Sequence, residues 1–209
     1  MFGARSKLDR GLDAFERREW KRARRLLEGA LQDEARPTGC YHLGLLYWRG
    51  LGGPADKHAA VECFARAADD GHPGAETAYG IALRSGVGVA KNNELARRYF
   101  RSAAGAGDAE AMIQLATMSE PDDARHWLVR ASETGYAPAM LHLSDFWLNR
   151  DPVEALAWLY ASVALSGEEA ARKRAAALAK EMAAREIAEA QKLGRGHVKD
   201  IQDRARGPR

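Results

Sequence analysis

Residues 39–71 read GCYHLGLLYWRGLGGPADKHAAVECFARAADDG. Two apolar stretches flank the glycines Gly50, Gly52 and Gly53, and such a group suits either a phosphate-binding loop or the corner between two helices. A dinucleotide-binding loop follows a β-strand and has the spacing GxGxxG, which is missing here, and the motif GxxxxGK[ST] occurs nowhere in the sequence. The glycines therefore predict a corner between two helices.

The stretches on both sides of such corners have helical spacing. In the stretch ARRYFRSAA the apolar positions are Ala96, Tyr99, Phe100, Ala103 and Ala104. Steps of three and four residues place these side chains on one face of a helix. A hairpin of two such helices cannot bury its apolar face alone, so we expect hairpins to stack.

The pattern recurs along the chain. Gly80 follows Gly44 by 36 residues, Ala116 follows by the same interval, and Ser144 comes 28 residues later. The second helices align in the same register on Ala60, Ala96, Ala124 and Ala155. We predict an all-α solenoid of antiparallel helix hairpins, with roughly ten to twelve helices, C-terminal capping helices and no β-sheet.

The expected organisation is a flexible N-terminus at 1–7, one solenoid domain at 8–193 and a basic, flexible tail at 194–209. The alanine-rich stretch before the tail suits end helices with a polar outer face. Within the solenoid, hairpins and capping helices are expected at 8–37, 38–71, 74–107, 109–135, 137–167 and 168–193.

Individual residues suit defined places in each hairpin. The small residues Gly44 and Gly80 allow the second helix to approach the first closely. Gly50 is expected to end the first helix in a left-handed conformation. Asp56, and Asn92 or Asn93, are placed to cap the start of the second helix.

Composition limits the function classes. Hydrophobic residues make up 46% and charged residues 29% of the chain, and the net charge is only +3, which is a weak basis for nucleic-acid binding. No apolar run is long enough to span a bilayer, and the start of the chain lacks a signal-peptide pattern. Two cysteines, Cys40 and Cys63, are too few for a disulfide framework, so we expect a cytoplasmic protein with unbridged, packed thiols.

The quoted stretch resembles a Sel1-like repeat, a longer-looped relative of the tetratricopeptide repeat. Leu43, Gly44 and Tyr47, followed by Ala60 and Phe64, match the pattern L-G-x-x-Y…A-x-x-x-F. The resemblance covers about residues 8–193, and it is weakest in the third full hairpin, whose connector TMSEPDDA lacks the glycine pair. Proteins of this family serve as adaptors and regulators, in bacteria often in envelope biogenesis, secretion or signalling.

The resemblance implies a non-catalytic adaptor that binds a peptide or helix of another protein in a concave groove. In tetratricopeptide repeats the first helix of each hairpin lines that groove. Transferred to this sequence, the lining positions are Tyr41, Leu45, Trp48, Arg49, Thr77, Ile81, Arg84, Ile113, Thr117, Leu141, Asp145 and Leu148. Ordinary packing between helices is the competing interpretation for each position, and for Trp48 we give the two interpretations equal weight.

Two alternatives remain open. A cysteine-rich branch of the family is β-lactamase-like, and Cys40 matches one half of its disulfide, but the partner position is Ala68 and no S-x-x-K motif is present. The second alternative is a nucleic-acid or anionic-surface binder working through the basic ends, RREWKRARR at 17–25 and the tail with Arg195, Lys199, Arg204, Arg206 and Arg209. A solvated helix face is the more ordinary interpretation of such charge runs.

The sequence offers no residue set that points to catalysis, a cofactor or a metal. The six histidines have no metal-binding spacing, and the paired acidic residues suit helix ends. We expect no enzyme activity, no cofactor and no metal, and a protein as partner rather than nucleic acid. The sequence leaves the oligomeric state open, with a monomer favoured.

Overall fold

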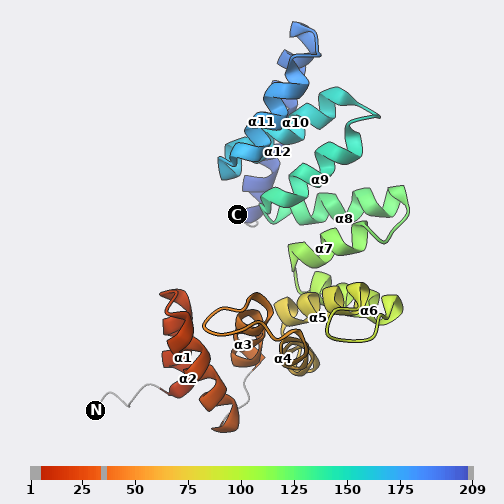
Figure 1. Cartoon of the computed structure of the whole chain (residues 1–209). Coiled ribbons are helices and arrows are strands. Elements are labelled where there is room, and N and C mark those ends of the chain that lie inside the picture. Colours follow the sequence, from red (N-terminus) through yellow and green to blue (C-terminus); the bar gives the residue numbers. More distant parts are fainter. Residues whose placement is uncertain (1–5, 34–36, 207–209) are drawn as a thin grey trace. The chain divides into compact units, whose positions relative to one another are not determined.

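The computed structural model describes residues 6–33 and 37–206, and over these residues it consists of helices and turns without a β-strand (Figure 1). The all-α fold predicted from the repeats is confirmed. The helices form two compact units: the N-terminal unit ends at Asp108 and the C-terminal unit begins at Ala109.

Within each unit, helices adjacent in sequence pack as hairpins. The N-terminal unit contains α1 (Lys7–Glu16), α2 (Trp20–Asp33), α3 (Pro37–Arg49), α4 (Lys57–Asp69), α5 (Pro73–Ser85) and α6 (Asn93–Gly105). The C-terminal unit contains α7 (Ala109–Ala116), α8 (Pro121–Glu133), α9 (Ala137–Trp147), α10 (Pro152–Ser166), α11 (Glu169–Ala179) and α12 (Ala184–Ala205).

The small residues on the first helices of two hairpins are required by close contact with an aromatic ring. A Cβ atom added to Gly44 would lie 2.5 Å from Cε1 of Phe64, and one added to Gly80 would lie 2.6 Å from Cε1 of Phe100. Both phenylalanine side chains are completely buried. The repeated glycine is therefore the counterpart of the repeated phenylalanine on the second helix.

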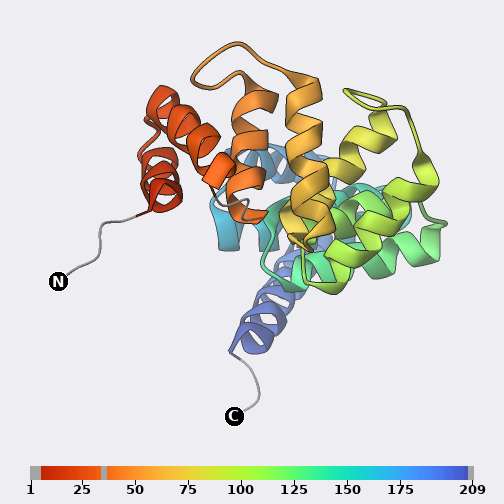
Figure 2. The ribbon, with the colours of Figure 1, turned by 90° about the horizontal axis from the view of Figure 1, so that it is seen from below.

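The glycine-rich connectors turn the corner as the sequence predicts, and Figure 2 shows both as open loops at the ends of their hairpins. Gly86 ends α5 in a left-handed conformation with φ of 72°, and Gly50 has φ of 67° after α3. The side chain of Asp56 accepts a hydrogen bond from the amide of Ala59, and Asn92, rather than Asn93, caps α6. These caps satisfy amide groups that have no partner within the helix.

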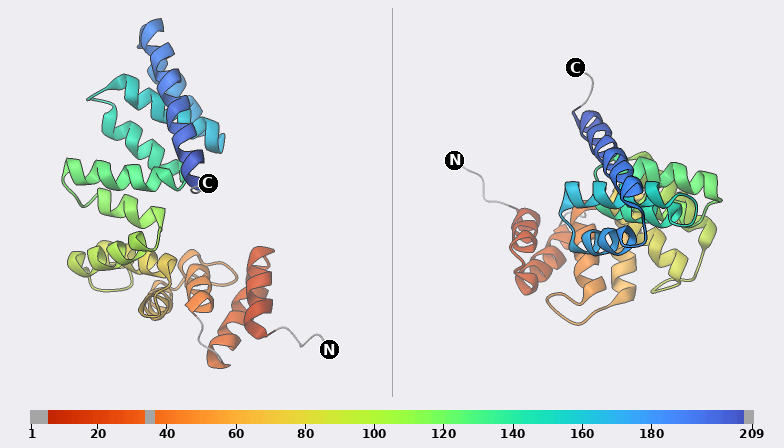
Figure 3. Two further views of the ribbon diagram at one scale, coloured as in Figure 1. Left: turned by 180° about the vertical axis from the view of Figure 1, so that it is seen from behind. Right: turned by 90° about the horizontal axis from the view of Figure 1, so that it is seen from above.

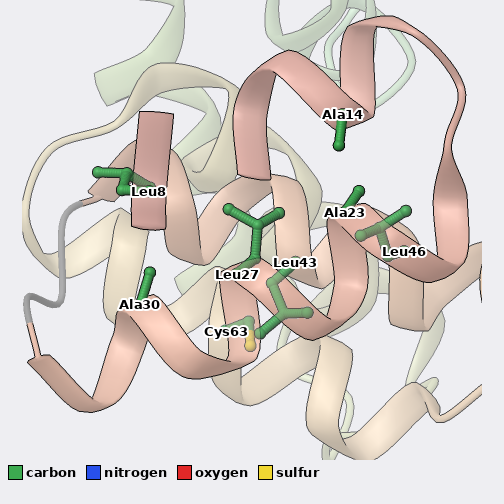
Figure 4. Close-up of a cluster of buried hydrophobic side chains, with 8 residues drawn as sticks. All are labelled: Leu8, Ala14, Ala23, Leu27, Ala30, Leu43, Leu46 and Cys63. Atoms are coloured by element: carbon green, nitrogen blue, oxygen red, sulfur yellow. The ribbon is translucent and has the colours of Figure 1, made fainter. Parts of the chain in front are cut away.

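The α1–α2 hairpin packs on the first full repeat through a shared apolar cluster. The cluster contains Leu8, Ala14, Ala23, Leu27, Ala30, Leu43, Leu46 and Cys63. Figure 4 shows Leu27, Leu43 and Cys63 gathered in its middle. The α1–α2 hairpin is thus part of the same core as α3 and α4.

Both cysteines are buried and unbridged. Burial, with a smaller contribution from nearby Cys40, raises the pKa of the Cys63 thiol to about 12. Burial also raises the pKa of Cys40. Since the thiolate is the reactive form, both residues act as apolar core side chains.

The tail expected to be flexible from residue 194 is instead helical to Ala205, although Arg209 lies outside the described residues. Figure 3 shows α12 as the long blue helix beside α10. Gly194 permits this contact, because a Cβ atom there would lie 2.8 Å from the carbonyl oxygen of Ala157. Ile201 is also buried, at 6% exposure, so α12 continues across the expected boundary because it covers apolar surface.

The contact between α10 and α12 is centred on two rings. Trp158, which is 7% exposed, stacks on His197 with ring centroids 3.9 Å apart. The indole Nε1 of Trp158 donates a hydrogen bond to Glu154 Oε1 at 3.1 Å. His197 Nε2 lies equally close to that oxygen but does not form a hydrogen bond of acceptable geometry.

In the part of the chain that the structure describes, no helix combines the length and apolar character needed to cross a membrane.

Candidate protein-binding surface

Four of the expected groove residues lie on one side of α3. Tyr41, Leu45 and Trp48 recur at steps of three and four residues, and Arg49 follows at the same side. The opposite side carries buried Cys40 and Leu43. The first three side chains are half-buried and Arg49 is exposed, so this side of α3 reaches the molecular surface.

Tyr41 contributes mainly to packing between hairpins. Its ring stacks on His72, at the start of α5, with centroids 4.5 Å apart. A Cβ atom at Gly74 would lie 3.0 Å from Cζ of Tyr41, which shows how closely α5 approaches the ring. Burial raises the pKa of the Tyr41 hydroxyl, and Asp108 adds to this effect.

Trp48 is partly packed and partly accessible. Its ring lies 6.1 Å from the ring of Phe64, and the ammonium group of Lys57 lies over it at 4.0 Å from the centroid. Lys57 also donates a hydrogen bond to the carbonyl oxygen of Trp48. Part of the Trp48 surface is therefore packed against neighbouring side chains, and the rest remains accessible.

The groove residues expected on α5 differ in their exposure. Thr77 is 4% exposed, and its hydroxyl donates a hydrogen bond to the carbonyl oxygen of Pro73 at 3.1 Å. Ile81 and Arg84 are half-buried and lie one and two turns further along the same side. Ile81 therefore continues the partly exposed side in this hairpin, whereas Thr77 is a packing residue.

In the C-terminal unit, Ile113 is buried at 3% exposure and Leu141 packs against the core cluster that contains Leu156. Asp145 forms an ion pair with Arg174 of α11. Thr117 and Leu148 are exposed, and Leu148 is 40% exposed. The positions transferred to this unit therefore do not form a continuous apolar surface.

Two tail arginines expected at a basic end are paired within the C-terminal unit. Arg204 forms an ion pair with Glu133 of α8, and Arg206 lies 4.0 Å from Asp203. The pairing of Arg204 with Glu133 could not be read from the sequence, because it depends on α12 packing near α8. Fewer free cations remain at this end than the sequence suggests.

The N-terminal unit has a surface hollow that the groove positions do not include. It is lined by Glu19, Trp20, Lys21, Arg22, Gly52 and Gly53, with a volume of about 460 Å³. In the sequence, Trp20 stands out only as an aromatic residue within the basic segment 17–25. The proximity of Gly52 and Gly53 to Trp20 depends on the tertiary packing of α2.

Within residues 6–33 and 37–206, no group of three or more histidine, cysteine or acidic side chains could hold a metal ion. His42 is engaged locally, since its Nδ1 lies 2.8 Å from the carbonyl oxygen of Thr38.

Comparison with known families explains the repeated hairpins. The Sel1 repeat model matches residues 37–72, 73–108 and 134–166. The chain belongs to the Sel1 repeat family. The matched segments correspond to the α3–α4, α5–α6 and α9–α10 hairpins, whereas α7–α8, with its short connector, is outside the match.

Solved structures share this Sel1 architecture. A Sel1 repeat protein from Oxalobacter formigenes matches with a TM-score of 0.72 at 22% identity, over 94% of this chain and 86% of that one. An immunity protein from Pseudomonas aeruginosa matches with a TM-score of 0.59 at 18% identity, over 97% and 88%. A protective antigen with an SLR fold from uropathogenic Escherichia coli matches with a TM-score of 0.56 at 18% identity, over 95% and 54%.

These likenesses concern the fold alone. A search of curated proteins found no match. The Sel1 repeat fold is generally a scaffold for protein–protein interaction.

Proposed function

We propose that this Sel1 repeat protein is a non-catalytic adaptor that binds a peptide or helix of a partner protein along the outer side of α3 and α5. We define this binding surface by Leu45, Trp48, Arg49 and Ile81. The observation that carries the proposal is the partial exposure of Leu45, Trp48 and Ile81 on equivalent sides of two successive repeats, with exposed Arg49 beside them.

The chemistry of the surface suits protein recognition. A partly exposed indole beside an arginine can bury apolar area and also pair with a carboxylate of the partner. Amphipathic helices bind such surfaces through apolar side chains spaced three and four residues apart. Tyr41 and Thr77 pack beside this surface, and contacts at the start of α5 hold both side chains in place.

The proposal can be tested by affinity capture from the source cells with purified protein and two variants, Leu45→Glu and Ile81→Glu. Each variant places a charge at the centre of the proposed contact, which should reduce partner capture by at least about tenfold. Val87→Glu is the control, because Val87 is an apolar residue of the same unit with an accessible side chain but lies in the α5–α6 connector.

The variants should retain the wild-type helical content and melting temperature, since the substituted side chains are not in the fully buried core. Capture of the same protein by wild type, Leu45→Glu and Ile81→Glu at equal levels would contradict the proposed surface.

A further inference from the structure

The turn between α1 and α2 and the first turns of α2 carry several exposed cations. Within the described residues, Arg17, Arg18, Lys21 and Arg25 are exposed and form no ion pair. Arg22 is paired with Glu19 at 2.8 Å, but its side chain remains 55% exposed. Unpaired surface cations attract anionic partners and raise the rate of association.

Arg24, in the middle of this basic segment, has a different role. Its Nη1 donates a hydrogen bond to the carbonyl oxygen of Pro54 at 3.0 Å, and its Nε donates one to Glu28 Oε1 at 3.0 Å. The guanidinium group also lies over the ring of Tyr47, 4.4 Å from its centroid. Arg24 therefore fixes the α3–α4 connector to α2.

The fixed connector forms one wall of the hollow over Trp20. Gly52, with φ of 76°, lies so close to α2 that an added Cβ atom would be 2.4 Å from the carbonyl oxygen of Trp20. The hollow has a volume of about 460 Å³, and its exposed lining is largely apolar. Trp20 is itself held by an edge contact with Phe15, with ring centroids 5.4 Å apart.

We propose that this surface, defined by Trp20, Lys21, Arg22, Arg25 and the Gly52–Gly53 backbone, binds an acidic segment of a partner protein. An apolar side chain of the segment occupies the hollow against the indole of Trp20. Carboxylates on either side of it pair with Lys21, Arg22 and Arg25, and Arg17 and Arg18 extend the positive field.

Charge complementarity and the shape of the hollow favour an acidic protein segment over nucleic acid. Surfaces for single-stranded nucleic acid use several aromatic side chains to stack successive bases, whereas this hollow contains Trp20 alone. Glu19 also lines the hollow, so the hollow itself suits an apolar side chain rather than a charged phosphate. A partner with a single apolar anchor between carboxylates satisfies both the apolar floor and the cationic rim.

The test uses a fluorescent peptide with one leucine flanked on both sides by glutamates, and fluorescence anisotropy of its binding to the full chain. Lys21→Glu/Arg25→Glu reverses two exposed cations without touching Arg24. We expect it to lower the affinity by at least about tenfold. Arg98→Glu/Arg101→Glu on α6 is the matched control, since both arginines are exposed and without an ion pair among the described residues.

Separate measurements test the apolar and the charged parts of the contact. Trp20→Ala removes the floor of the hollow and should also lower peptide affinity by about tenfold, with circular dichroism used to confirm that the helices are retained. A peptide in which glutamine replaces glutamate should bind weakly to the wild type. If Trp20→Ala loses helical content, the two-cation variant and the glutamine peptide still decide the outcome.

Three results would overturn the proposal. The first is no peptide binding at about 50 mM salt, and the second is an equal loss of affinity in the α2 and α6 variants. The third is tighter binding of single-stranded DNA, or of phosphatidylglycerol vesicles, than of the peptide at about 200 mM salt, which would assign the surface to a different class of partner. Leu45→Glu should bind the peptide as the wild type does, so failure here is distinguishable from failure of the α3–α5 surface.

Discussion

At the scale of single residues, the fold depends on complementary sizes at repeated positions. Gly44 and Gly80 each face a buried phenylalanine at a distance that leaves no room for a side chain. The sequence predicted the small residue, because it recurs at a constant spacing, but it did not identify the phenylalanine of the second helix as its contact. It did not predict that Thr77 is buried, because its place on the helix alone cannot show which neighbouring helix covers it.

Gly44→Ala should therefore destabilise the protein. The helix propensity of alanine favours the change by up to about 1 kcal/mol, but forcing a methyl group against Phe64 costs about 1–3 kcal/mol. Gly105→Ala is the control, because a Cβ at that helical position would have no atom within 4 Å beyond its chain neighbours and the backbone of its own helix. Urea unfolding should show a lower midpoint for the first variant and an equal or higher one for the second; equal midpoints would argue against the tight contact.

His72 makes the stability of the N-terminal unit depend on pH. Its Nδ1 accepts a hydrogen bond from the amide of Ala75 and caps α5, which requires that nitrogen to be unprotonated. Burial, assisted by His42, lowers the pKa of His72 below its ordinary value of 6.5. The unfolded chain then binds the proton more tightly, so stability is greatest above pH 6.5 and falls as the pH decreases through 6.5 toward the folded pKa.

His72→Asn separates this titration from the cap, because asparagine caps a helix without titrating. The wild type should lose more stability than this variant between about pH 8 and about pH 5, measured by thermal unfolding. Parallel pH profiles for the two proteins would show that His72 is not the group responsible.

At the scale of elements, the sequence predicts helices better than it predicts their ends. Caps at Asp56 and Asn92 and left-handed glycines mark the connectors, since these local features need no tertiary information. The C-terminal boundary was wrong for the converse reason. The tail was expected to begin at Gly194, but this glycine lies within α12 and allows α12 to approach α10 closely.

Ile201→Ala tests whether α12 is part of the folded C-terminal unit. Ile201 is 6% exposed, so the truncation should cost about 2–5 kcal/mol, as for other large apolar side chains. Leu193→Ala on the same helix, at a residue that is 38% exposed, should cost less than about 0.5 kcal/mol. Native-state hydrogen exchange of α10 amides measures the loss of stability in both variants. No loss of stability in Ile201→Ala would support a flexible tail instead.

At the scale of the whole molecule, the Sel1 repeats place partly exposed helix sides at the surface. The repeats matched at residues 37–72 and 73–108 carry the partly exposed side of α3 and α5. Sequence analogy placed further groove positions in the C-terminal unit, but Ile113 is buried there and Asp145 is paired with Arg174. We therefore centre partner binding on the N-terminal unit.

Site-specific photo-crosslinking in the source cells tests this claim most directly. A photoreactive amino acid is placed at Leu45, at Ile81 or, as control, at Val87, each of which has an accessible side chain. The account predicts one crosslinked partner shared by the Leu45 and Ile81 positions and absent at Val87. No crosslink at either helix position, or the same crosslink at Val87 with equal yield, would contradict it.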